Sequence, residues 1–201
     1  MNPIKVGIIS LSGVGGISGG IIAYKHGVFS ESTRIKEKIK GFPIMWADDS
    51  VWSAKVTALT SDTTNTFHES LSKLKNPNFT KEKIRDWCIE SLNSEFKEED
   101  IRFKNVQDYC VYRNKDKLGS STLNSRDTTK WTTIKESLKK ETGTLSNNMK
   151  TIKNKLTGEN GTTKDENALK TWCEGFYSEI WMGEKDMDFV DAKTYCKEKT
   201  N

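Results

Sequence analysis

Beyond residue 48 the apolar residues recur every three to four positions, the period of a helix with one buried face. No part of this region shows the strict alternation that a half-buried strand requires. Asp48, Asp49 and Ser50 are good helix N-caps, and the apolar face after them predicts one long helix that ends at 76–78, in Asn-Pro-Asn. The same pattern predicts a second helix around Trp87 and a shorter third helix that ends near residue 110.

The second part of the chain follows the same plan. A long apolar face runs from Trp131 to Leu156, with Gly143 inside it as the point where this helix would kink. The break at 158–161 separates it from a helix that carries Trp172 and a last helix that ends near residue 196. We therefore expect an all-α fold of two duplicated three-helix units, each with one long and two short helices.

The aromatic residues and cysteines of the two parts occur in the same order. Those of the first part are Trp52, Trp87, Cys88, Phe103, Tyr109 and Cys110, and those of the second are Trp131, Trp172, Cys173, Phe189, Tyr195 and Cys196. A duplicated unit must supply the same buried contacts twice, so these residues name the expected core. The repeat core is predicted to contain Trp52, Trp87, Tyr109, Trp131, Trp172 and Tyr195. Trp46 and Trp181 lie outside the repeat and are predicted to make exposed contacts.

The repeat and the shifts in composition divide the chain into five segments. We expect an apolar N-terminal segment at 1–25, a polar connector at 26–47, a first helical unit at 48–113, a linker at 114–126 and a second helical unit at 127–201.

The four cysteines form two sets with matched spacing. Cys88 and Cys110 are 22 residues apart, and Cys173 and Cys196 are 23 apart. These spacings do not form a zinc-ligand pattern, so no metal site is predicted. Two interpretations remain: two disulfides, or four buried thiols. Duplication favours disulfides within each unit, and each bond would add roughly 3 kcal/mol by closing its loop.

Residues 6–24 are 19 residues without a charge, flanked by Lys5 and Lys25. This length suits a membrane-spanning helix or a long signal sequence, and no Ala-x-Ala cleavage site follows it. We therefore expect an uncleaved anchor in the lipid bilayer. The glycines also suggest a phosphate-binding loop. However, a dinucleotide fingerprint starting at Gly13 and Gly15 needs a glycine where Ser18 stands, so no cofactor is predicted.

Charge and composition exclude some classes of protein. The 32 basic and 28 acidic residues are interleaved, whereas a nucleic-acid-binding protein normally carries a basic patch or stripe. Hydrophobic residues make up only 34% of the chain, but the regular spacing of Trp and Phe predicts a folded protein rather than a disordered one. No nucleic-acid partner is expected.

Candidate catalytic groups are sparse. A nucleophile–histidine pair would have to use His26, which lies next to the apolar segment, or His68, which has no motif around it. Paired carboxylates occur in charge-rich turns at Glu98, Glu99, Asp186 and Asp188. A solvated surface is the ordinary reading of such turns. We therefore predict no enzymatic activity and no catalytic residues.

Short motifs connect the chain to a known family. They are Ile-Arg-Asp-Trp-Cys at 84–88, Leu-Lys-Thr-Trp-Cys at 169–173, and Tyr-Cys at 109–110 and 195–196. With the glycine-rich apolar segment, they make the chain resemble the paralogous uncharacterised proteins that haemotropic mycoplasmas carry in large numbers. The resemblance covers nearly the whole chain. It implies an anchored, surface-displayed protein with a role in antigenic variation or host contact, and it supplies no catalytic residues.

The side of the membrane can be argued both ways. Basic residues follow the apolar segment in greater number than precede it, which by the positive-inside rule puts the domain in the cytoplasm. Large domains translocate largely regardless of charge, and paired cysteines favour an oxidising compartment. We expect a single-pass protein of the cell membrane whose helical domain is extracellular and contacts a host protein. The alternatives are a cytoplasm-facing, membrane-tethered scaffold with reduced thiols, and an enzyme with an unrecognised site.

Overall fold

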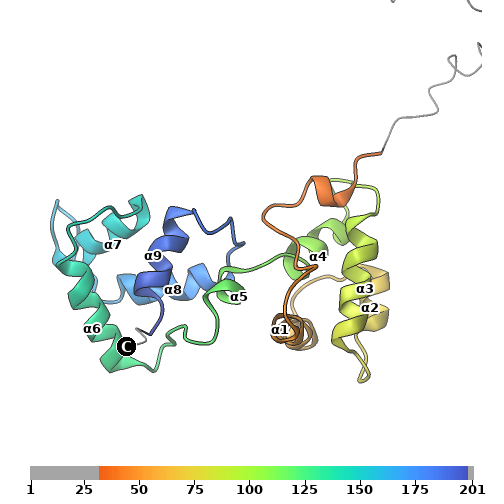
Figure 1. Cartoon of the computed structure of the whole chain (residues 1–201), viewed down its shortest axis with the longest axis horizontal. Coiled ribbons are helices and arrows are strands. Elements are labelled where there is room, and N and C mark those ends of the chain that lie inside the picture. Colours follow the sequence, from red (N-terminus) through yellow and green to blue (C-terminus); the bar gives the residue numbers. More distant parts are fainter. Residues whose placement is uncertain (1–31, 199–201) are drawn as a thin grey trace, which may run out of the picture. The chain divides into compact units, whose positions relative to one another are not determined.

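The computed structural model describes residues 32–198, and Figure 1 shows their helices. In chain order these are the 3-10 helix η1 (Ile35–Glu37) and the α-helices α1 (Asp49–Ser61), α2 (Glu69–Leu74), α3 (Lys81–Leu92), α4 (Ile101–Tyr109), α5 (Asn114–Leu118), α6 (Thr128–Lys139), α7 (Asn147–Thr157), α8 (Ala168–Ser178) and α9 (Met187–Tyr195). Between residues 32 and 198, extended pairing is limited to four isolated bridges. The expected all-α fold is confirmed for this part of the chain.

The predicted membrane anchor lies outside the described residues, because the apolar segment spans 6–24. Within residues 32–198, no helix combines the length and the apolar character needed to cross a membrane.

The expected long first helix of each unit is wrong, because a loop divides it into α1 and α2, and into α6 and α7. In each loop a carboxylate captures backbone amides that a continuous helix would use. Asp62 accepts from the amides of Thr64 and Asn65, at 2.8 and 3.0 Å. Glu141 accepts in the same way from the next two amides, at 3.0 and 2.7 Å. The first half (33–111) therefore carries α1–α4 and the second half (112–198) carries α6–α9 as its main helices, four rather than three.

In each half a lysine in or directly after the second helix binds the chain where the first helix ends. The Lys75 ammonium donates to the carbonyl of Asp62. The Lys153 ammonium donates to the carbonyl of Glu141 at 2.6 Å. Asp62 is the C-cap of α1 and Glu141 directly follows the C-cap of α6, so these bonds fix the chain as it leaves each helix.

Each half has its own buried core. In the first half α3 packs against both α1 and α4, and in the second α7 packs against both α6 and α8. Five of the predicted core residues are buried: Trp52, Trp87, Tyr109, Trp131 and Tyr195. The expectation for Trp172 needs correction, because its side chain is only half buried and lies at the edge of the second core.

Residues expected to form the connector and the linker belong to the fold. Ile35 and Ile44, from the predicted connector, are buried in the first core. Leu118 and Leu123, from the predicted linker, are buried in the second core, and α5 packs against α8. Apolar residues are too widely spaced here to form a periodic face, which is why the sequence pattern does not mark them.

The segment before the first helix of each half pairs with the end of its last helix. The amide of Ile44 donates to the carbonyl of Cys110 at 2.9 Å, and the amide of Leu123 donates to the carbonyl of Cys196 at 3.0 Å. The second cysteine of each half is thus held by a backbone hydrogen bond as well as by its disulfide.

Candidate functional site

The structure pairs the cysteines as the spacing predicts. Cys88 pairs with Cys110 and Cys173 with Cys196, with Cα atoms 5.5 and 5.6 Å apart. These distances lie within the range that a disulfide spans. The first cysteine of each pair lies on α3 or α8, and the second directly follows α4 or α9. All four side chains are buried, so the pairs hold helices together and are not accessible sites.

A buried tyrosine from the last helix of each half binds the carboxylate that ends the first helix. The Tyr109 hydroxyl donates to Asp62, and the Tyr195 hydroxyl donates to Glu141 at 3.0 Å. Burial, with the carboxylate adding to it, raises the pKa of both hydroxyls well above the ordinary tyrosine range. The bond from Tyr109 is the largest of several that lower the pKa of Asp62. These groups hold their protons and charges fixed near neutral pH, which suits a structural role better than proton transfer.

His68, the candidate base, serves as the N-cap of α2. Its Nδ1 accepts from the amide of Ser70 at 3.2 Å and lies 2.8 Å from the Ser70 hydroxyl. That hydroxyl also accepts the indole N–H of Trp87 at 2.9 Å. Among the described residues no carboxylate is bonded to the imidazole. His68 and Ser70 therefore lack the third group that would orient a catalytic base. The other candidate base, His26, lies outside the described residues.

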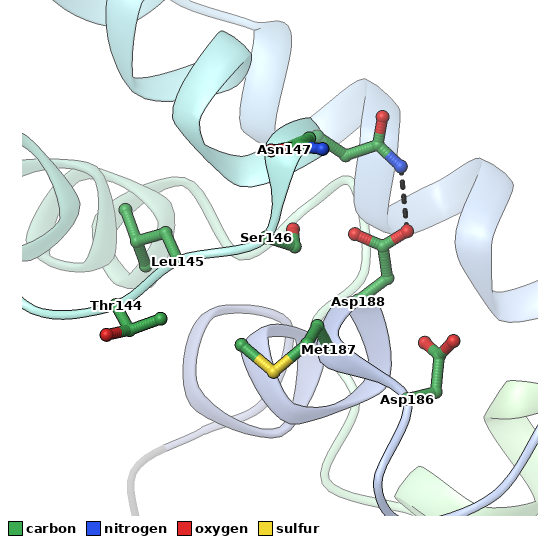
Figure 2. A pocket seen from close by; sticks show the side chains of 8 residues that line it. Thr144, Leu145, Ser146, Asn147, Asp186, Met187 and Asp188 are labelled. Atoms are coloured by element: carbon green, nitrogen blue, oxygen red, sulfur yellow. Dashed lines mark hydrogen bonds between the residues drawn. The ribbon is translucent and has the colours of Figure 1, made fainter.

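The paired carboxylates have different surroundings. Glu98 and Glu99 are exposed. Asp186 and Asp188 stand at the start of α9 beside a shallow hollow of about 600 Å³ (Figure 2). The Asp186 carboxylate caps α9, and Asp188 accepts from the Asn148 amide group at 2.7 Å, the bond dashed in Figure 2. Among the described residues no group of three His, Cys, Asp or Glu could hold a metal ion.

The prediction that Trp181 makes exposed contacts is wrong, because its side chain is half buried inside an aromatic cluster. Its ring lies 5.0 Å from Phe42 and 5.9 Å from Tyr112, measured between centroids. The Lys117 ammonium lies 3.7 Å from the Tyr112 centroid and 4.7 Å from that of Trp181. An ammonium over two rings is a favourable cation–π arrangement. The cluster remains open at Phe42, which is 49% exposed.

Trp46 is exposed, as the sequence predicts. It precedes α1 and is 94% exposed, the highest value among the large apolar side chains of the described residues. A large aromatic side chain left in water at this level contributes little to its own fold. It is therefore a candidate contact residue.

A buried ion pair lies beside a cleft between α1 and the α5–α8 region. Lys55 of α1 is only 5% exposed, and its ammonium donates to Asp116 of α5 at 2.7 Å. Burial lowers the pKa of Lys55, and the Asp116 carboxylate opposes that shift. Glu174 and Tyr177 of α8 complete the cleft, whose volume is about 680 Å³. The apolar periodicity of the sequence did not predict this ion pair, because Lys55 lies on the helix face that the pattern assigns to the core.

No protein-family model, curated protein or solved structure matches this chain significantly.

Proposed function

We propose that this protein is a membrane-anchored helical binding module displayed outside the cell, with a role in host contact or antigenic variation. The observation that carries the proposal is the pairing of all four cysteines, one pair inside each half. Disulfides persist in oxidising compartments and are rare in the cytoplasm, where thiols are kept reduced. Two disulfides at matching positions support an oxidising compartment more strongly than a single one would.

The membrane part of the proposal comes from the apolar segment 6–24 of the sequence. A span of this length would hold the domain at the bilayer through its N-terminal side. The basic residues that follow it support the alternative, a cytoplasm-facing scaffold with reduced thiols.

Exposed apolar side chains support a binding role. Trp46 is 94% exposed, and Phe42 and Met182, near Trp181, are 49% and 57% exposed. Contiguous exposed apolar patches are typical of protein contact sites, and Phe42 and Met182 place two such side chains beside the Trp181 cluster. His68 and Asp186 cap helices and Asp188 accepts from Asn148, so three of the candidate catalytic groups have structural roles, which supports a binding protein over an enzyme.

We also infer that the two halves are copies of one module. The support is the equivalence of their specific contacts. The Tyr109–Asp62 bond corresponds to the Tyr195–Glu141 bond, and each half repeats the cysteine pair and the lysine at the end of its first helix. A helical module present in two copies offers two related surfaces on one chain.

Protease treatment of intact cells tests the side of the membrane. Cells are treated with trypsin, and the loss of the helical domain is followed by immunoblot. A cytoplasmic protein serves as the control for lysis. The proposal expects cleavage in intact cells and no free thiols when cells are quenched in acid and alkylated before reduction. Protection until the membrane is permeabilised, with four alkylated cysteines, would establish the cytoplasmic alternative instead.

A further inference from the structure

A hollow of about 260 Å³ lies between α7 and α8, with the ring of Trp172 in its wall. Apolar Ile152 and Ala168 line it as well. The polar groups that line it include Asn148, Lys155, Asp165 and Thr171. The lining is richer in polar groups than that of a typical small-molecule site, and one aromatic ring among hydroxyl, amide and charged groups suits a ligand that carries many hydroxyls.

The corresponding tryptophan of the first half has no such opening. Trp87 is buried, and its indole N–H donates to Ser70 of α2 at 2.9 Å. Asn148 of α7 stands where Ser70 stands, but its amide donates to Asp188 at 2.7 Å. No described residue accepts from the indole N–H of Trp172. The same position is thus closed in one half and open in the other.

One contact restrains the Trp172 ring. It stacks on the buried ring of Phe176, with 4.7 Å between centroids and 18° between planes. A ligand that packs on a ring already held in place does not have to immobilise it, which lowers the cost of binding.

The polar groups around the ring are available for hydrogen bonds. Lys155, Asp165 and Thr171 are exposed. The Lys155 ammonium and the Thr171 hydroxyl have no side-chain partner among the described residues. Asp165 uses one carboxylate oxygen for the amide of Asn167 at 2.8 Å, and the other oxygen has no partner there.

We propose that this hollow is a saccharide site that binds one pyranose ring. A pyranose has a face of C–H groups that packs on an aromatic ring and a rim of hydroxyls that both donate and accept. Trp172 supplies the aromatic surface, the Lys155 ammonium and the indole N–H donate, and Asp165 accepts. One positive and one negative group at the rim match a neutral sugar better than an anion. The volume is below the roughly 300–1,000 Å³ of sites for larger ligands, so it suits a single ring.

This inference deepens the proposed function by naming the ligand class of a binding module, and it rests on that module being a binding protein. Its test is independent of membrane topology. Failure of sugar binding would leave the protease result untouched, and a cytoplasmic domain would leave the sugar result untouched.

The experiment uses the full chain purified in lauryldimethylamine oxide, a detergent without a sugar headgroup. Saturation-transfer NMR is recorded with methyl β-galactoside, methyl β-glucoside, methyl α-mannoside and N-acetylglucosamine. At least one is expected to show transfer to its ring C–H protons and a measurable Kd. Absence of transfer from all four at millimolar concentration would overturn the proposal.

Two kinds of variant place the binding at Trp172. Trp172→Phe keeps an aromatic group against Phe176 but loses the indole N–H and ring area, and is expected to weaken binding about tenfold, or roughly 1.4 kcal/mol. Lys155→Ala and Thr171→Ala change exposed side chains, and each is expected to weaken it about two- to tenfold. Asp86→Ala, at the exposed position of the first half that corresponds to Thr171, is the matched control and should leave Kd unchanged. Binding that none of the second-half variants alters would place the sugar elsewhere and refute the site.

Discussion

At the scale of single residues, the tyrosine–carboxylate bonds tie stability to pH in a definite direction. The pKa of Tyr109 and Tyr195 is raised, chiefly by burial. Above a pH of about 10 the unfolded chain therefore releases phenolic protons that the folded chain keeps. The contribution of these groups to stability is complete below that pH and is lost as the pH rises. The lowered pKa of Asp62 and Glu141 acts oppositely, with stability complete above a pH of about 4 and lost as the pH falls.

We predict that the buried tyrosines ionise only as the protein unfolds in alkali. Ultraviolet difference absorbance should show phenolate appearing together with the loss of helical circular dichroism, rather than before it. In Tyr109→Phe the alkaline unfolding midpoint should move up, because one group that destabilises the folded state at high pH is gone, although stability at neutral pH falls. Full phenolate absorbance near pH 10 with helix content intact would contradict the burial described here.

At the scale of elements, the periodic faces located α3, α4, α8 and α9 near their observed bounds. The same periodicity joined α1 to α2 and α6 to α7, because apolar spacing continues across both loops. The break comes from side chains that bind the backbone: Asp62 and Glu141 each take two amides. Such capture depends on local polar chemistry that a hydrophobic pattern does not record. Matching the two halves position by position would have paired these carboxylates.

The N-caps of α7 and α3 should contribute differently to stability. The Ser146 hydroxyl accepts from the Met149 amide at 3.1 Å in a buried setting, whereas Thr80 accepts from Lys83 at 3.5 Å on the surface. We expect Ser146→Ala to cost about 1 kcal/mol of unfolding free energy and Thr80→Ala to cost clearly less. Urea denaturation of both variants measures the difference. A larger loss for Thr80→Ala would show that the cap geometry does not set the cost.

At the scale of the whole molecule, the two cores were predictable because large apolar residues recur at helical spacing. The candidate sites were less so. Ser70 accepts the indole N–H of the buried Trp87, whereas Asn148 at the corresponding place bonds to Asp188 and Trp172 stays open. Sequence spacing gives no direct measure of such contacts. The sequence pattern did not predict the Lys55–Asp116 ion pair for the same reason, since the pair joins α1 to a helix inside the predicted linker.

That ion pair makes a further prediction. Lys55→Met should destabilise the protein by about 3–5 kcal/mol, because it leaves the Asp116 carboxylate poorly solvated and without its partner. The double variant Lys55→Met/Asp116→Asn should recover much of that loss, since it removes both charges and keeps an acceptor for the Arg113 amide, which Asp116 binds at 2.8 Å. Thermal and urea unfolding of the two variants provide the comparison. Equal destabilisation of the single and double variants would mean that packing, rather than charge, accounts for the cost.

The cysteine pairs connect the fold to the compartment, and they give the last prediction. Each pair closes a loop of one half, with a sequence separation of 22 or 23 residues, so each should stabilise its own half by roughly 3 kcal/mol. Non-reducing peptide mapping of protein isolated without reductant should recover 88 linked to 110 and 173 linked to 196. Reduction, or the double variant Cys88→Ser/Cys110→Ser, should lower Tm, while the second pair stays intact in that variant because it lies in a separate core. A link between 88 and 173 would join the two cores and contradict the fold. Four thiols alkylated on unfolding without reductant would remove the observation on which the extracellular assignment rests.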